Sequence, residues 1–139
     1  MTADGGDRPG AGQTLSAFTR HLGFTLIEAE PGRAVLRCPF RPEFTNMSGV
    51  AHGGVAAALM DTACGVALTA QPDGRRAGKV VTVMFSLNYL APFRDGMEAL
   101  CEARVLGGGA KLASAEARMT DAATGALLAT GHGSFRRIA

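Results

Sequence analysis

The sequence predicts an α+β domain in which an antiparallel sheet wraps around one long, buried helix. One observation is the segment 54–69, which consists almost entirely of small and apolar residues, as a helix in a protein core does. The other is the series of four strand-like, alternating segments that follows it. Strands that come in succession after a single core helix favour an antiparallel sheet packed on that helix.

The chain before the long helix divides into a tail, a short helix and a hairpin. Residues 1–13 are rich in Gly and Asp and are expected to be a disordered tail, which places the domain at 14–139. Apolar residues at helical spacing after Thr14 predict a short helix that Gly23 ends. Two strand-like segments around the turn signal Pro31-Gly32 predict a hairpin, over residues 24–30 and 33–39.

The long helix is expected over 53–70, after a loop at 40–52 that is rich in turn-forming residues. Four strands are expected after it, with Gly107–Gly109 as a loop: 80–90, 97–106, 111–121 and 126–138. The third of these is ambiguous, because its composition favours a helix whereas its alternation favours a strand. We choose the strand, since a helix there would leave the neighbouring strands short of partners. Gly131 and Gly133 in the last strand suggest bends or close contacts.

The composition excludes several classes of function. Hydrophobic residues make up 47% and charged residues 19%, which is typical of a globular domain. A formal net charge of +2 without a block of Lys and Arg argues against a nucleic-acid partner. Cys38, Cys64 and Cys101 form no CxxC pair, so they predict core packing and neither a disulfide framework nor a metal site. Without an apolar signal segment or a membrane-length run, a cytoplasmic location is expected.

Asp61 is the clearest candidate for chemistry. It lies in the middle of the apolar helix, where Asp is a poor helix former and an unpaired buried carboxylate costs free energy. No Lys or Arg occurs at 53–70 to pair with it. Gly54 and Gly65 lie on the same helical face and are expected to leave open space above it. The alternative is a structural Asp that caps a loop or a partner's backbone, since perturbed carboxylates also occur outside functional sites.

The beginning of the same helix is a second candidate site. His52-Gly53-Gly54 stands there, and free N–H groups at a helix N-terminus bind developing negative charge. The glycines would let a substrate carbonyl approach the backbone closely. His52 is expected to order the loop rather than act as a general base, and Asn46 could donate or accept a hydrogen bond nearby. An ordinary glycine-rich helix entry would have the same pattern.

The spacing of these residues resembles that of a known family. The run from Asn46 through His52-Gly53-Gly54 to Asp61-Thr62 resembles the motif of hotdog-fold thioesterases, and most of all that of the phenylacetic acid degradation (PaaI-type) family. Segment 81–92 looks like the next strand of that family, and segment 125–131 like its final strand. The resemblance implies a hotdog fold and hydrolysis of an acyl-CoA thioester, with no metal or prosthetic group.

The resemblance also implies roles for individual residues. Asp61 would activate water as a general base or attack the thioester carbonyl itself, and the backbone N–H of Gly53 would polarise that carbonyl. Asn46 would orient the site, and Thr82 matches a position that can hold the attacking water. Other positions of the motif and of the next strand would contact the substrate: His52, Gly54, Thr62 and Met84.

In the family, the Asp-bearing helix of one subunit meets the HGG loop of the other. The resemblance therefore implies a homodimer with two sites at its interface, and a tetramer of two dimers. Many relatives carry a polar residue where this chain has Met84, which would make the acyl pocket more apolar here. The substrate is expected to carry an aryl or medium-chain acyl group. Lys111 is the first candidate to bind the CoA diphosphate, with Arg136 and Arg137 next.

Three other interpretations stay open. A hotdog hydratase or dehydratase also acts on acyl thioesters, but it typically needs an Asp/His pair for proton transfer to carbon, and only His52 lies near Asp61 in the sequence. A non-catalytic acyl-CoA-binding regulator would need an output domain, for which the residues before the first strand are too few. A purely structural dimeric module would leave Asp61 and the open helix entry unexplained.

Overall fold

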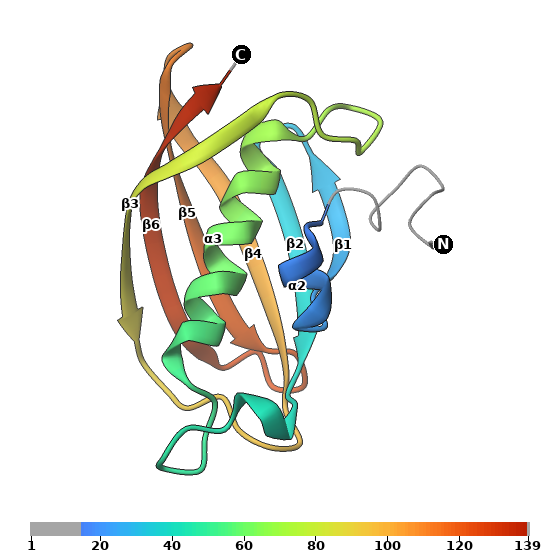
Figure 1. The fold of residues 1–139 in the computed structure, drawn as a ribbon, viewed down its shortest axis with the longest axis vertical. Coiled ribbons are helices and arrows are strands. Elements are labelled where there is room, and N and C mark those ends of the chain that lie inside the picture. The colour runs from blue at the N-terminus through green and yellow to red at the C-terminus, as the bar shows by residue number, and fades with distance from the viewer. Residues whose placement is uncertain (1–14, 139) are drawn as a thin grey trace.

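The computed structural model describes residues 15–138, in which a six-stranded sheet curves around a long helix (Figure 1). The predicted tail at 1–13 lies outside the described residues. The elements follow in this order: α2 (Ala17–His21), β1 (Thr25–Glu30), β2 (Arg33–Pro39), the 3-10 turn η2 (Pro42–Phe44), α3 (Gly53–Thr69), β3 (Lys79–Tyr89), β4 (Glu98–Gly108), β5 (Leu112–Asp121) and β6 (Leu127–Ile138).

The strands lie in the order β1-β2-β4-β5-β6-β3, and every neighbouring pair is antiparallel. The predicted hairpin is confirmed, since β1 pairs with β2 across the turn at Gly32, whose φ of +85° suits glycine. β3 directly follows α3 in the chain but pairs only with β6. It is therefore an edge strand, and its outer edge has no neighbour within the described part of the protomer.

α3 is buried along most of its length because nearly all its side chains are small and apolar. Leu59, Met60 and Val66 on the helix have no exposed surface. The sheet presents alternate small residues to it, and these are also buried: Ala99, Cys101 and Ala103 on β4, and Ala113, Ala115 and Ala117 on β5. Small side chains on both surfaces let the helix lie close to the sheet. The expected core helix is confirmed.

The choice of a strand for 111–121 is also confirmed, as β5 spans Leu112–Asp121 with strict alternation of buried and more exposed residues. The loop expected at Gly107–Gly109 is partly wrong, because β4 continues to Gly108. A bulge after Val105 shifts the register, and Gly108 adopts a φ of +134°. A Cβ at Gly108 would lie 2.4 Å from Cα of Ala113, so the strand continues because this position has no side chain.

The glycines of β6 make close contacts, as expected. A Cβ at Gly133 would lie 2.5 Å from the carbonyl oxygen of Met84 and from the ring of Phe85. Its absence lets β3 pack tightly on β6. All three cysteines are buried and unpaired, which confirms their core packing. Among residues 15–138, no helix combines the length and hydropathy needed to cross a bilayer.

Candidate active site

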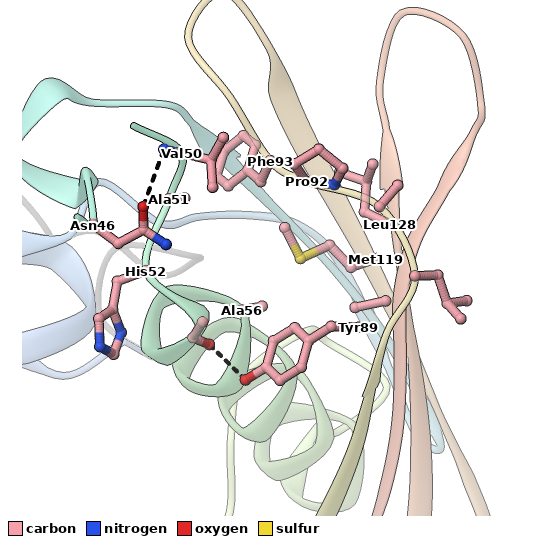
Figure 2. Close-up of a pocket in the computed structure, with 14 residues that line it drawn as sticks. Asn46, Val50, Ala51, His52, Ala56, Tyr89, Pro92, Phe93, Met119 and Leu128 are labelled. Atoms are coloured by element: carbon pink, nitrogen blue, oxygen red, sulfur yellow. Dashed lines mark hydrogen bonds between the residues drawn. The ribbon is translucent and has the colours of Figure 1, made fainter. Parts of the chain in front are cut away.

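A pocket of about 400 Å³ opens at the N-terminal end of α3 (Figure 2). The loop before the helix forms one side of it, and the end of β3 with the following segment forms the other. Asn46, His52 and Tyr89 are the polar side chains that line it, and no Asp, Glu, Lys or Arg does. The rest of the lining is apolar, so the pocket suits an uncharged group whose polar atoms sit near the helix.

Asn46 is held by its own loop. Its Oδ1 accepts hydrogen bonds from the backbone N–H groups of Ser48, at 2.8 Å, and Val50, at 3.2 Å. This Asx turn uses the oxygen of the side-chain amide and fixes its orientation. Nδ2 has no acceptor among the described residues, and Figure 2 shows this nitrogen on the pocket side of Asn46. Asn46 thus presents a donor to the pocket.

His52 is the N-cap of α3. Its Nδ1 accepts from the N–H of Gly54 at 2.8 Å, and its carbonyl oxygen accepts from Val55 at 3.0 Å. These bonds confirm that His52 orders the helix entry, and they leave the Gly54 amide occupied. The N–H of Gly53 has no acceptor in residues 15–138, and Gly53 lines the pocket whereas Gly54 does not. Gly53 and Asn46 therefore each bring an unpaired donor to the lining of the pocket.

Tyr89 fixes the same turn of the helix from the side of the sheet. Its hydroxyl donates to the carbonyl oxygen of Gly53 at 2.8 Å. A Cβ at Gly53 would lie 3.0 Å from the Tyr89 ring and hydroxyl, a tight contact that glycine avoids. The sequence pattern did not single out Tyr89 as functional. The sequence did contain one indication. Tyr89 is two residues after Leu87 and four after Phe85, so the alternation of the strand places all three on the helix side of β3.

Asp61 lies two turns further along α3 and faces β3. Thr82 on β3 donates a hydrogen bond from Oγ1 to Oδ1 of Asp61 at 2.6 Å. Asp61 is half-buried rather than buried as the sequence suggested, because it faces the edge strand β3, which no further strand among residues 15–138 covers. Charge-assisted hydrogen bonds of this kind stabilise a carboxylate and fix its rotamer. One carboxylate oxygen remains for a water molecule or a substrate.

The open space expected from the glycines beside Asp61 is absent. A Cβ at Gly54 would lie 2.9 Å from Nδ1 of His52. Arg76 and Val80 bound the space beside Gly65, since a Cβ there would lie 3.6 Å from the Arg76 guanidinium and 3.7 Å from a methyl group of Val80. The guanidinium of Arg76 bonds Thr69 and the Gly65 carbonyl, and burial lowers its pKa. These glycines accommodate neighbours and do not open a channel above Asp61.

The two parts of the site are separate within one protomer. Gly53 and Asn46 line the pocket, whereas Asp61 and Thr82 do not. Gly53 and Asp61 are eight residues apart on one helix, which corresponds to about 12 Å along its axis. That distance is too long for both groups to act on one carbonyl carbon. The four predicted catalytic residues thus form two separate pairs in the protomer. Asn46 and Gly53 lie together at the pocket, and Asp61 and Thr82 lie together further along α3.

The remaining predicted residues lie apart from the pocket. Thr62 is half-buried beside Asp61. Met84 pairs with Ser134 and is 45% exposed, on the sheet face opposite to its neighbour Phe85, so it does not line the pocket. Lys111 is exposed at the β4–β5 turn, and Arg136 and Arg137 end β6 at the same end of the sheet. That end adjoins the C-terminal end of α3, far from the pocket, since Arg137 donates to the Leu68 carbonyl at 3.0 Å (Figure 1).

The cysteines are poor nucleophiles in this fold. Burial raises the pKa of Cys38 and of Cys64 to about 12, and the Asp61 carboxylate adds to the rise at Cys64. Burial also raises the pKa of Cys101. All three are therefore thiols at neutral pH, whereas thiolate is the reactive form. Within 15–138, no group of three or more His, Cys, Asp and Glu side chains has the arrangement of a metal site.

Known proteins are similar to this chain in sequence and in fold. The family model described as the thioesterase superfamily matches residues 48–127. Human acyl-coenzyme A thioesterase 13 is 35% identical over 115 residues, which cover 82% of this chain and 80% of that protein. The structure of a conserved Pseudomonas aeruginosa protein gives a TM-score of 0.81 at 31% identity, covering 91% of this chain and 97% of that one.

A second solved structure, of a protein from the phenylacetic acid degradation operon, has a lower identity and therefore supports only the similarity of the fold. The Escherichia coli PaaI protein gives a TM-score of 0.81 at 22% identity, over 89% of this chain and 86% of that one. The segment that matches the family includes the capped helix entry, Asp61 and the strands that hold them. The chain belongs to the thioesterase superfamily, and its sheet wrapped around α3 is the hotdog fold.

Proposed function

We propose that this protein hydrolyses an acyl-CoA thioester to a free acid and CoA. The main support is the pair of unpaired donors, the N–H of Gly53 and Nδ2 of Asn46, at a pocket without charged side chains. Such donors stabilise the negative charge that develops on a carbonyl oxygen during acyl transfer, and each contributes about 3 kcal/mol. The similarity to acyl-coenzyme A thioesterase 13 adds to this support.

The complete site is proposed to form between two copies of the chain. Asp61 and Thr82 lie too far from Gly53 and Asn46 in one protomer, so a second chain would supply the missing pair. β3 favours this arrangement because it is an edge strand that carries Thr82 and exposes Val81 and Val83 at 52% and 61%. Exposed apolar strand edges are surfaces on which chains pair. A homodimer would then have two equivalent sites.

In the proposed reaction, the thioester carbonyl accepts hydrogen bonds from Gly53 and Asn46. Asp61, held by Thr82, either removes a proton from water as its oxygen attacks the carbonyl carbon, or attacks that carbon itself. In the second case water hydrolyses the resulting anhydride. The C–S bond breaks in both cases, and the sulfur of CoA leaves with a proton. Side chains, backbone and water suffice, so neither a metal nor a prosthetic group takes part, and CoA is part of the substrate.

The finer features of the proposal concern substrate, assembly and location. The apolar pocket favours an aryl or medium-chain acyl group. Lys111, Arg136 and Arg137 form a cationic end of the sheet that would bind CoA phosphates from a site shared with the partner. Leu106 and Leu112, both more than half exposed, offer apolar surface for joining two dimers into a tetramer. The three unpaired cysteines favour a reducing compartment such as the cytoplasm.

The test is thiol release from aromatic and aliphatic acyl-CoAs with the wild type, Asp61→Asn and Thr82→Val. We expect Asp61→Asn to lower kcat by about 10²–10⁴-fold, because it removes the general base or nucleophile. Thr82→Val should lower kcat about 10-fold with little change in KM, since the loss of one hydrogen bond frees the carboxylate rotamer. Circular dichroism and gel filtration serve as controls for fold and assembly.

The outcomes separate the alternatives. Hydrolysis that does not depend on Asp61 would make the assigned chemistry wrong. If no acyl-CoA were hydrolysed while CoA esters still bound, a binding protein or a hydratase would replace the thioesterase. The hydratase is less consistent with the protomer, since no His among the described residues contacts Asp61 and His52 uses Nδ1 to cap α3.

A further inference from the structure

We infer that Met119 forms the closed end of the acyl pocket and sets the longest acyl group that the protein accepts. This inference rests on the proposed function, because it assigns the apolar part of the pocket to the acyl chain of that substrate. It goes beyond the proposed function in naming the residue that limits chain length. Nothing in the sequence motif marks Met119, which lies on β5, outside the helix and strand that carry the predicted site residues.

The exposure of the lining residues shows which end of the pocket is closed. Tyr89 and Leu90 are 56% and 57% exposed, so they form the mouth. Met119 and Leu128 line the same pocket but are only 1% and 2% exposed, so they lie where it ends. The pocket therefore begins beside the donors of the helix entry and ends inside the core. A chain attached to a carbonyl at Gly53 would extend toward Met119.

The other residues at the closed end are less able to set its depth. Phe93 is held in an aromatic cluster, with its ring centroid 5.5 Å from that of Phe40 in an edge-to-face contact. The backbone carbonyl of Leu128 accepts from Leu90 and Ala91, which ties that segment to the pocket wall. Met119 is an unbranched side chain, and Figure 2 shows it extending from the sheet toward the pocket between Phe93 and Ala56. It is the long side chain that reaches across the end.

The residues beside Met119 are small, so a shorter side chain at this position would let the pocket extend further into the core. The cross-strand neighbours of Met119 are Cys101 on β4 and Ala129 on β6, and both are buried and small. Replacement of Met119 by Ala would remove about three heavy atoms and leave a void continuous with the pocket. Because the lining is apolar, additional methylene groups of a substrate would fill this void. A bulkier side chain such as Phe would instead fill part of the closed end and shorten the pocket.

The experiment compares straight-chain acyl-CoAs of increasing length with wild type, Met119→Ala and Met119→Phe. We expect the length that gives the highest kcat/KM to increase by about two to three carbons in Met119→Ala and to decrease in Met119→Phe. For the first length that the wild type rejects, Met119→Ala should raise kcat/KM by about 10-fold or more. Leu36→Ala is the matched control, because Leu36 is fully buried on β2 and does not line the pocket.

A binding series keeps the inference testable without turnover. Alkyl-CoA thioethers of the same lengths cannot be hydrolysed, so their affinities, measured by calorimetry, report pocket depth alone. Affinity should stop rising at a longer chain in Met119→Ala than in wild type or Leu36→Ala. Identical length profiles in wild type and both Met119 variants would overturn the inference. Absence of hydrolysis with a shifted binding profile would instead count against the proposed function and leave the role of Met119 supported.

Discussion

At the scale of single residues, some polar groups at the start of α3 have hydrogen-bond partners within the protein, and others do not. His52 takes the N–H groups of Gly54 and Val55, and Tyr89 donates to the carbonyl of Gly53. Asn46 uses its oxygen within the loop. The N–H of Gly53 and the Nδ2 of Asn46 remain without acceptors among the described residues. The donors are thus prepared before a substrate arrives, which is how fixed dipoles stabilise a developing charge at low reorganisation cost.

Tyr89→Phe tests whether the hydroxyl positions the Gly53 amide. The variant keeps the ring against Gly53 but loses the 2.8 Å bond to its carbonyl. We expect kcat to fall about 3- to 10-fold with little change in KM, since the loss of one hydrogen bond costs about 1 kcal/mol. Steady-state thiol release measures both constants. Leu90→Ala serves for comparison, because it also alters the mouth without touching α3 and should change KM more than kcat.

The motif predicted the candidate site residues but not all of their contacts. Asp61, Gly53 and Asn46 follow from their spacing along the chain, which is a local property. The bond between Tyr89 and Gly53 joins residues 36 positions apart, and its formation depends on how β3 crosses α3. The same holds for Arg76, which occupies the face of α3 that seemed open. Such contacts depend on tertiary packing, and no local sequence pattern predicts them.

At the scale of elements, α3 and the sheet form a core of small side chains. Alternation, together with the need of the neighbouring strands for a partner, predicted β5 correctly, and buried alanines face α3 at every second position. The end of β4 was missed for the opposite reason. Glycines usually signal a loop, but here Gly107 and Gly108 continue the strand through a bulge that brings the backbones of β4 and β5 close together. The packing of two strands overrode the local signal.

The buried thiols predict that the core becomes less stable at alkaline pH. The pKa of Cys38 and Cys64 is about 12 in the folded protein, against 9.0 ordinarily. Since the folded pKa is raised, the stabilisation is complete below pH 9 and is lost as the pH rises toward 12. Between these limits the unfolded state releases protons that the folded state retains, so stability falls by about 1 kcal/mol per thiol for each pH unit.

Urea unfolding from pH 8 to pH 11 measures this effect. Cys64→Ala should be less stable than the wild type at pH 8, where the lost packing dominates, but should decline less steeply above pH 9. The difference between the two proteins isolates Cys64 from other groups that titrate in this range. Parallel declines would mean that Cys64 titrates alike in both states, contrary to its burial.

At the scale of the whole molecule, one protomer holds the two pairs of candidate site residues at separate places along one helix. Gly53 lies at the pocket, at the N-terminal end of α3, and Asp61 lies in the middle of the helix beside Thr82, about 12 Å further along the axis. A two-fold axis that places the Asp61 of one chain near the Gly53 of the other would complete both sites at once. The shared site was expected only from the resemblance to the family, and it stays a prediction, whereas the separation of the two pairs is seen in the protomer itself.

Subunit complementation tests the shared site. Asn46→Asp keeps the oxygen that orders the loop but removes the Nδ2 donor, and Asp61→Asn removes the carboxylate. Each variant alone should be nearly inactive. After co-refolding of equal amounts, half of the dimers would be mixed and one of their two sites would be intact, which gives roughly a quarter of wild-type activity. If both groups of a site came from one chain, mixing would restore nothing.

The contact between Gly53 and Tyr89 also constrains how this sequence can change over generations. Any side chain at position 53 would meet the aromatic ring at 3.0 Å, and a smaller residue at position 89 would leave the first turn of α3 without its tether. A side chain at position 53 would require the Tyr89 ring to shift, and the loss of Tyr89 would remove one hydrogen bond to the helix. In a population of variants selected for activity, substitutions at position 53 should therefore be rarer where position 89 keeps its aromatic ring.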